Sequence, residues 1–129
     1  MKILNLTQHL ATKEQKEQRV IDLPDDMRKE LCALLTFDTL EEALNAEKRA
    51  KDIMWFVSEH YDLSNIFAVM IGGAPFLIKY LEAELALYDL QPLHAFTQRI
   101  VLERQNDEGT ITKQSMFKHI GFVPEPAWV

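Results

Sequence analysis

Asn65 to Leu81 is the stretch of this chain whose residue types best suit the binding of an anion. It reads NIFAVMIGGAPFLIKYL, an apolar strand that stops at Gly72-Gly73 and leads to a helix beginning at or next to Pro75. Glycines let another molecule approach the backbone closely, and the free N–H groups of a helix N-terminus suit a phosphate. The turn is neither a GxGxxG motif nor a P-loop. Gly72 and Gly73 could equally serve only close packing of the helix on the strand, so two interpretations stand side by side.

Polar side chains also follow two other predicted strands. The first strand, Lys2 to Leu6, is followed by Thr-Gln-His, and the strand expected from Leu93 carries Phe-Thr-Gln-Arg. In an open α/β sheet, ligands bind beyond the carboxyl ends of the parallel strands, so we expect the three segments to converge. The predicted pocket contains Thr7, Gln8, His9, Gly72, Gly73, Ala74, Thr97, Gln98 and Arg99, with Asn5 and Phe96 beside them.

Arg99 and His9 are the predicted pocket residues that could stabilise or transfer charge. Arg99 shares a strand face with Glu103, and a structural ion pair with that carboxylate carries the same weight as ligand binding. His9 could act as an acid or a base, cap a helix, or lie on the surface. Lys118-His119 could add charge, although a solvated or cross-strand role is expected for them.

Residue spacing argues against several other chemistries. The four histidines show no HxH or HExxH pattern, so no metal or other cofactor is expected. There is no GxSxG, and Cys32 lies in a leucine-rich helix, where a buried small hydrophobe is expected rather than a nucleophile. Trp55-Phe56 and Trp128 are expected to serve core or subunit packing.

Capping signals and periodicity outline the elements that must position these residues. Two capping boxes predict a short polar helix after the first strand and a single long helix in the middle of the chain. They are Thr12 with Gln15 and Thr39 with Glu42, and the helices are expected to end near Gln18 and His60. The other predicted elements are a brief strand over Val20 to Leu23, a helix from Pro24, the Pro75 helix to about Tyr88, and two extended segments, Leu93 to Arg104 and Thr110 to Phe122, joined at Gly109. This order predicts one α/β domain over residues 1–129, a Rossmann-like three-layer sandwich with a mainly parallel sheet and a C-terminal β-hairpin.

Composition limits the classes of partner. The chain has 129 residues, 47% of them hydrophobic, which is enough for one core. Its formal net charge of −6 argues against extended nucleic-acid binding but not against a small anionic ligand. One cysteine, no apolar N-terminal leader and no apolar run near the roughly 20 residues that span a bilayer predict a cytoplasmic protein without a membrane partner.

Several of these segments resemble a known family. PLHAFTQR at Pro92 to Arg99, then Glu103, a turn at Gly109 and FKHIGF at Phe117 to Phe122, together with the N-terminal TQH and TKEQ, are similar to small single-domain CRISPR-associated proteins with a CARF-like, Rossmann-type fold. The resemblance covers about the first 20 residues and residues 65–123.

That resemblance implies a ligand and a reaction. Some members of the group are, or are suspected to be, ring nucleases, which cut cyclic oligoadenylate second messengers without a metal. It implies a homodimer with the ring across its two-fold axis, and attack of a ribose 2′-OH on the adjacent phosphate. The implied roles are phosphate stabilisation by Gly72, Gly73 and Arg99, ribose positioning by Thr7, Gln8 and Thr97, and acid or base action by His9. The alternative is a non-catalytic nucleotide-binding or interaction module of a mobile element or defence system.

Overall fold

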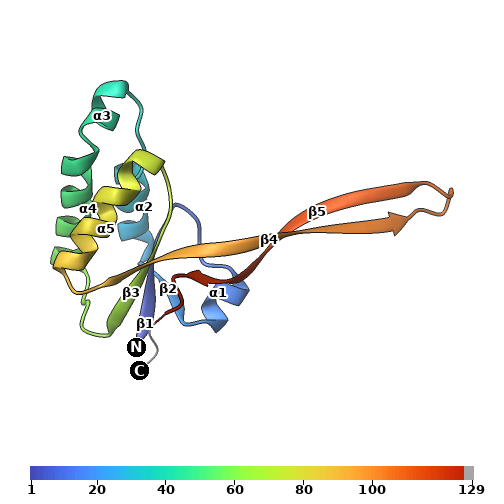
Figure 1. The fold of residues 1–129 in the computed structure, drawn as a ribbon, viewed down its shortest axis with the longest axis horizontal. Helices are drawn as coiled ribbons and strands as arrows, with labels where there is room; N and C mark the ends of the chain where they lie inside the picture. The colour runs from blue at the N-terminus through green and yellow to red at the C-terminus, as the bar shows by residue number, and fades with distance from the viewer. Residues whose placement is uncertain (127–129) are drawn as a thin grey trace.

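A computed structural model describes residues 1–126, which form an α/β fold around one sheet (Figure 1). The strands are β1 (Lys2–Leu6), β2 (Val20–Asp22), β3 (Ile66–Ile71), β4 (Gln91–Gln105) and β5 (Ile111–Val123). The helices are α1 (Lys13–Glu17), α2 (Asp25–Leu34), α3 (Leu40–Leu44), α4 (Ala46–His60) and α5 (Pro75–Leu87).

The sheet is mixed, with the strand order β2-β1-β3-β4-β5. β2, β1, β3 and β4 run parallel, and β5 is antiparallel to β4. Parallel neighbours need crossover connections, which α1 makes between β1 and β2, α2 to α4 between β2 and β3, and α5 between β3 and β4. The predicted α/β class with a C-terminal hairpin is therefore confirmed.

Apolar clusters pack on both faces of the sheet. The larger one joins alternate residues of β1 and β3 to α2, α4 and α5, and it includes Leu4, Leu6, Val69, Ile71, Leu31, Ile53, Met54, Leu77 and Leu81. The smaller one consists of Ile3, Ala11, Val20, Ala68, Met70, Leu93 and Phe122. Successive side chains of a strand point to opposite faces, so the uninterrupted apolar runs of β1 and β3 supply both clusters. Long helices cover one face, whereas the short α1, the loop before it and the end of β5 cover the other.

The prediction of one long helix from Thr39 to His60 is wrong, because the helix breaks at Asn45. The backbone of Asn45 leaves the helical region (φ −101°, ψ 29°), and its side chain donates to the Glu41 carbonyl oxygen at 3.1 Å. Asparagine favours such local bonds over a continuous helix. Leu40 and Leu44 are consequently exposed, and the buried stripe begins at Ala46.

The predicted packing residues have different environments. Phe56 is half-buried against the larger cluster, whereas Trp55 is exposed and does not belong to the core. Cys32 is half-buried, with its Sγ atom 3.7 Å from the Gln8 carbonyl oxygen. Trp128 lies outside the described residues. Among the described helices, none has the length and apolar character needed to cross a membrane.

Residues 96–118 of β4, the turn and β5 form an arm that projects from the sheet (Figure 1). β4 pairs with β3 only over Gln91–His94, and it pairs with β5 from His94 to Gln105. Beyond His94, β4 therefore pairs with no strand other than β5 among the described residues. The predicted turn is confirmed: the Gly109 N–H donates to the Asn106 carbonyl oxygen at 3.0 Å, and Gly109 has a positive φ of 82°.

His119 fixes the base of this arm to α1. Its Nε2 atom lies 2.9 Å from Gln18 Oε1, and its Nδ1 atom lies 3.5 Å from Gln15 Nε2. Gln18 Oε1 can only accept, so Nε2 carries the proton and Nδ1 accepts. Gln15 Oε1 in turn accepts from the Thr12 N–H at 2.9 Å, which fixes the orientation of the Gln15 amide. The solvated or cross-strand role predicted for His119 is therefore wrong, because this side chain is buried against a helix distant in sequence.

The network around His119 predicts that acid destabilises the fold. Burial lowers the pKa of His119 below 6.5, while the nearby Glu14 carboxylate raises it by a smaller amount. Just below pH 6.5 the unfolded chain therefore binds more protons than the folded one, so the free energy of unfolding should fall as the pH decreases through that window. Urea unfolding from about pH 7.5 to about pH 5 should show this slope, and His119→Phe should reduce it. His60→Gln, which changes an exposed histidine, is the control; equal slopes in all three proteins would contradict the assignment.

Candidate functional site

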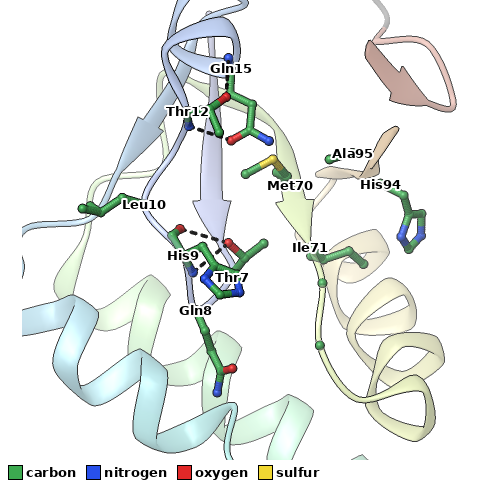
Figure 2. A pocket seen from close by; sticks show the side chains of 12 residues that line it. Thr7, Gln8, His9, Leu10, Thr12, Gln15, Met70, Ile71, His94 and Ala95 are labelled. Carbon is green, nitrogen blue, oxygen red and sulfur yellow. Dashed lines mark hydrogen bonds between the residues drawn. The ribbon is translucent and has the colours of Figure 1, made fainter. Parts of the chain in front are cut away.

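A cavity of about 510 Å³ lies at the carboxyl ends of β1 and β3 (Figure 2). The direction in which strands are added to the sheet reverses here, because β2 lies on one side of β1 and β3 lies on its other side. Such a switch point is where open α/β sheets bind ligands. The residues that line the cavity are Thr7, Gln8, His9, Leu10, Thr12, Gln15, Met70, Ile71, Gly72, Gly73, His94 and Ala95.

Asn5 holds the loop that forms one wall of the cavity. Its Nδ2 atom donates to the His9 carbonyl oxygen at 2.7 Å and to Asp22 Oδ1 at 2.8 Å. Its Oδ1 atom accepts from the Thr7 N–H at 2.9 Å and from the Thr7 hydroxyl at 2.7 Å. Asp22 Oδ1 also accepts from the Ala11 N–H at 3.0 Å. A side chain buried at the end of β1 thus uses both of its donors and both of its acceptor positions to shape the loop.

The three predicted residues of this loop lie at the cavity but in different settings. Thr7 is half-buried, and its hydroxyl is bonded to Asn5. Gln8 extends toward the C-terminal end of α2, and its Nε2 atom donates to Oγ1 of Thr36, which follows that helix, at 3.1 Å (Figure 2). His9 is exposed, and its backbone N–H donates to Thr7 Oγ1 at 3.3 Å. The imidazole of His9 is the ionisable group that this loop brings to the cavity.

Gly72 and Gly73 form the opposite wall. Gly73 has φ +134°, which side chains rarely allow, and a Cβ added there would meet no atom within 4 Å. A Cβ on Gly72 would make an ordinary 3.5 Å contact with Thr7 Cγ2 on the neighbouring strand end. Ala74 is the N-cap of α5, with no side-chain cap bond, and it packs against the larger cluster instead of lining the cavity. No side chain therefore caps the backbone N–H groups at the start of α5, and Pro75 itself contributes no N–H.

Thr97, Gln98 and Arg99 do not line the cavity with the other predicted residues. Ile71, the last residue of β3, pairs with His94, so β4 meets the cavity at His94 and Ala95. Arg99 lies four residues beyond Ala95, about 13 Å along an extended strand. Its guanidinium donates to Ser115 Oγ at 2.9 and 3.2 Å, while Glu103 lies 3.9 Å from Lys113. A role for this trio in ligand binding stays a prediction, and it cannot come from the cavity lining of the same chain.

No Lys or Arg belongs to the described cavity lining, so its ionisable side chains are His9 and His94. His94 lies at the rim, where its Nε2 atom is 3.3 Å from Glu82 Oε1. Within residues 1–126 no group of three or more His, Cys, Asp or Glu side chains could hold a metal ion. The cavity therefore offers hydrogen-bonding groups, apolar walls and backbone amides rather than a strong positive charge.

Sequence reasoning missed the contributions of α1 and β4 to this site. Thr12 and Gln15 were predicted as a capping box, and that pair is confirmed, but its position beside the cavity depends on how α1 packs. The cavity contacts of His94 and Ala95 follow from the register of β4 against β3. A strand register between parallel strands leaves no local mark in the sequence, so no motif could have indicated it.

Replacing Asn5 should destabilise the protein and loosen this loop. Asn5→Ala removes four hydrogen bonds and leaves buried partners unsatisfied, so we expect the free energy of unfolding to fall by about 2–4 kcal/mol. Urea unfolding measures this value. Asn65→Ala, at an exposed asparagine, should change it by less than about 0.5 kcal/mol. Equal effects of the two substitutions would show that the Asn5 network is unimportant.

The two glycines should respond differently to alanine. Gly73→Ala places a side chain at φ +134° and should cost about 1–3 kcal/mol of unfolding free energy. Gly72→Ala makes only an ordinary van der Waals contact and should be nearly neutral for stability. Thermal or urea unfolding of the two variants tests this order; a larger loss at Gly72 would contradict the described turn.

Comparison with known proteins identifies a family but no activity. No curated protein and no solved structure is significantly similar to the chain. A family model described as "Uncharacterized protein MJ1673 family" matches residues 1–123, almost the whole sequence. On that match, the chain belongs to the MJ1673 family of uncharacterized proteins.

Proposed function

We propose that this protein binds a cyclic oligoadenylate in the cavity between β1 and β3, as a homodimer with a Rossmann-like, CARF-like fold. The observation that carries the proposal is the meeting of two predicted segments, Thr7 to His9 and Gly72-Gly73, across one cavity at the switch point of the sheet. The resemblance to small CRISPR-associated proteins, drawn from the sequence, supplies the identity of the ligand. The charge of the chain is compatible with a small ligand and not with a long nucleic acid.

The lining suits a nucleotide in chemical terms. Leu10, Met70 and Ile71 offer apolar surface for an adenine base. The Thr12 hydroxyl, which accepts from the Gln15 N–H, keeps a proton to donate at the other end of the cavity, whereas the Gln15 amide is already bonded to the Thr12 N–H and His119 (Figure 2). Backbone N–H groups near Gly72 and Gly73 precede a helix N-terminus, which favours a phosphate. Pockets of about 300–1,000 Å³ hold small ligands, and at about 510 Å³ this one has room for part of an oligoadenylate ring. In a dimer, the facing pocket of the second copy holds the remaining part of the ring.

Cleavage would proceed by transfer of the phosphate within the ring. The ribose 2′-oxygen attacks the adjacent phosphorus and gives its proton to the His9 imidazole. The bond from phosphorus to the 5′-oxygen breaks, that oxygen takes a proton from solvent water, and His9 returns its proton to solvent. The products are a 2′,3′-cyclic phosphate and a free 5′-hydroxyl. Amides at Gly72 and Gly73 stabilise the phosphate oxygens, while Thr7 and Gln8 help to position the ribose. No metal takes part in these steps.

Binding without cleavage is the second candidate, and one observation favours it. The described lining contains no lysine or arginine to stabilise the charge that develops on the phosphate. The Thr7 hydroxyl is also engaged by Asn5, which limits its availability to a ribose. A protein with this cavity could sequester the messenger rather than destroy it.

Incubation with radiolabelled cyclic tetra- and hexa-adenylate tests both candidates. A ring nuclease should yield linear products that end in a 2′,3′-cyclic phosphate, and His9→Ala should slow their formation by about 100-fold or more while binding persists. His60→Ala, at an exposed histidine on α4, should leave the rate unchanged. Binding without product in the wild-type protein supports the second candidate. Absence of both binding and product with either ring would end the proposal.

A further inference from the structure

The arm, residues 96–118, carries uncovered apolar side chains. Phe117, Ile111 and Val101 are 71%, 63% and 52% exposed. A two-stranded ribbon is marginally stable in water without packing against another surface. Among residues 1–126, the outer edge of β5 also pairs with no other strand, since the sheet ends at β5. The arm therefore has the properties of a segment that is covered in an assembly.

Three of the four most exposed large apolar residues of the arm, Phe117, Ile111 and Val101, lie on one face, and the fourth, Phe96 at 54%, lies on the other. Alternate residues of β4 share a face, so Thr97, Arg99 and Val101 follow Ala95, which lines the cavity. Register pairs place Phe117 beside Arg99 and Ile111 beside Gln105, on the same face. We name this surface, formed by Thr97, Arg99, Val101, Phe117 and Ile111, the cavity-side face of the arm. Leu102 and Met116, on the other face, are less exposed at 49% and 47%.

Charge separates the arm from the rest of the chain. Residues 96–118 contain four basic residues, Arg99, Arg104, Lys113 and Lys118, and three acidic ones, Glu103, Asp107 and Glu108, so the arm has a formal net charge of +1 (4 − 3). The whole chain nevertheless has a net charge of −6, so the remainder is strongly acidic. A second copy of the same chain therefore offers the complementary charge. The described lining of the cavity contains no Lys or Arg, and the arm begins directly after Ala95 at the rim.

The area of the arm matches that of a stable dimer. By strand dimensions, one face of the ribbon is about 35 Å long and about 10 Å wide, or about 350 Å². Reciprocal docking of two arms covers two such faces and the two surfaces under them, about 1,400 Å² in total, which lies within the range of specific interfaces.

We propose that each cavity is completed by the arm of a second copy. The cavity-side face of one arm lies across the cavity rim of the other chain, near Leu10, and brings Arg99 to the anionic ligand, with the reverse contact made by symmetry. The Arg99 contact rests on the proposed function, whereas the docking of the arm does not. Arg99, which stands outside the cavity of its own chain, then supplies the missing cation from the partner.

Measurement of the molar mass tests the docking without a ligand. Light scattering after gel filtration should give twice the 15.0 kDa of one chain. Phe117→Ser should shift the equilibrium toward the monomer by about tenfold or more in dissociation constant. Leu87→Ser, at a residue of α5 that is 76% exposed, is the matched control and should leave the dimer intact. A monomeric wild-type protein at high concentration, or a dimer that Phe117→Ser leaves unchanged, would overturn the proposal.

Disulfide trapping tests where the arm lies. In a Cys32→Ala background, one chain carries Leu10→Cys and a second, distinguishable chain carries Val101→Cys. On oxidation the mixture should form the disulfide between the two different chains. Replacing Leu10→Cys by Leu44→Cys, at a residue of α3 that is 77% exposed against 60% for Leu10, should abolish it. A dimer that forms no link from Leu10 to Val101, or that forms it equally from Leu44, would contradict this placement.

A third experiment tests the role of Arg99 itself. Arg99→Ala should retain the dimer mass but weaken binding of cyclic oligoadenylate by about tenfold or more, and Arg104→Ala, on the opposite face of the ribbon, should not. The wild-type protein could form the dimer, and the cysteine variants the expected disulfide, while no cyclic oligoadenylate binds. In that case the proposed ligand fails and the docking of the arm stands. Unchanged binding in Arg99→Ala would overturn the role of Arg99 alone.

Discussion

The buried amide of Asn5 connects the parts of the protein on which the site depends. It lies at the end of β1, holds the Thr7 to His9 loop through two backbone groups and a hydroxyl, and bonds Asp22 at the end of β2. Asp22 in turn holds the Ala11 N–H, immediately before the Thr12 cap of α1. α1 then holds His119 at the base of β5. A continuous set of hydrogen bonds thus runs from the first strand to the last.

A second constraint is the unequal length of neighbouring strands. β3 ends at Ile71, yet β4 continues from its partner His94 to Gln105. The free carboxyl ends of β1 and β3 leave a cavity, and the excess length of β4 becomes an arm that starts at the cavity rim. The site and the arm are therefore two results of the same sheet geometry. An exposed two-stranded ribbon with apolar residues is costly for an isolated chain.

Local signals in the sequence predicted most elements because their causes are local. The capping box of Thr12 and Gln15 and the turn at Gly109 follow from bonds between residues close together in the chain. The Thr39 cap also forms, since its side chain accepts from the Glu42 N–H. The helix after it was predicted too long because the apolar pattern of Leu40 and Leu44 outweighed the single polar Asn45. A local bond made by one asparagine decided that boundary, and periodicity could not reveal it.

The candidate site divides in the same way. The sequence by itself determined that Thr7, Gln8, His9, Gly72 and Gly73 follow apolar strands, and parallel strands bring such ends to one edge of a sheet. Only the tertiary structure decided that β4 crosses this edge at His94 and Ala95, which moves Arg99 into the arm. It also decided that His119 is buried against α1 and that the described cavity lining holds no basic side chain. The physical reason is that residue order specifies which groups end each strand, whereas the register between strands, set by packing across the whole sheet, specifies where those groups lie.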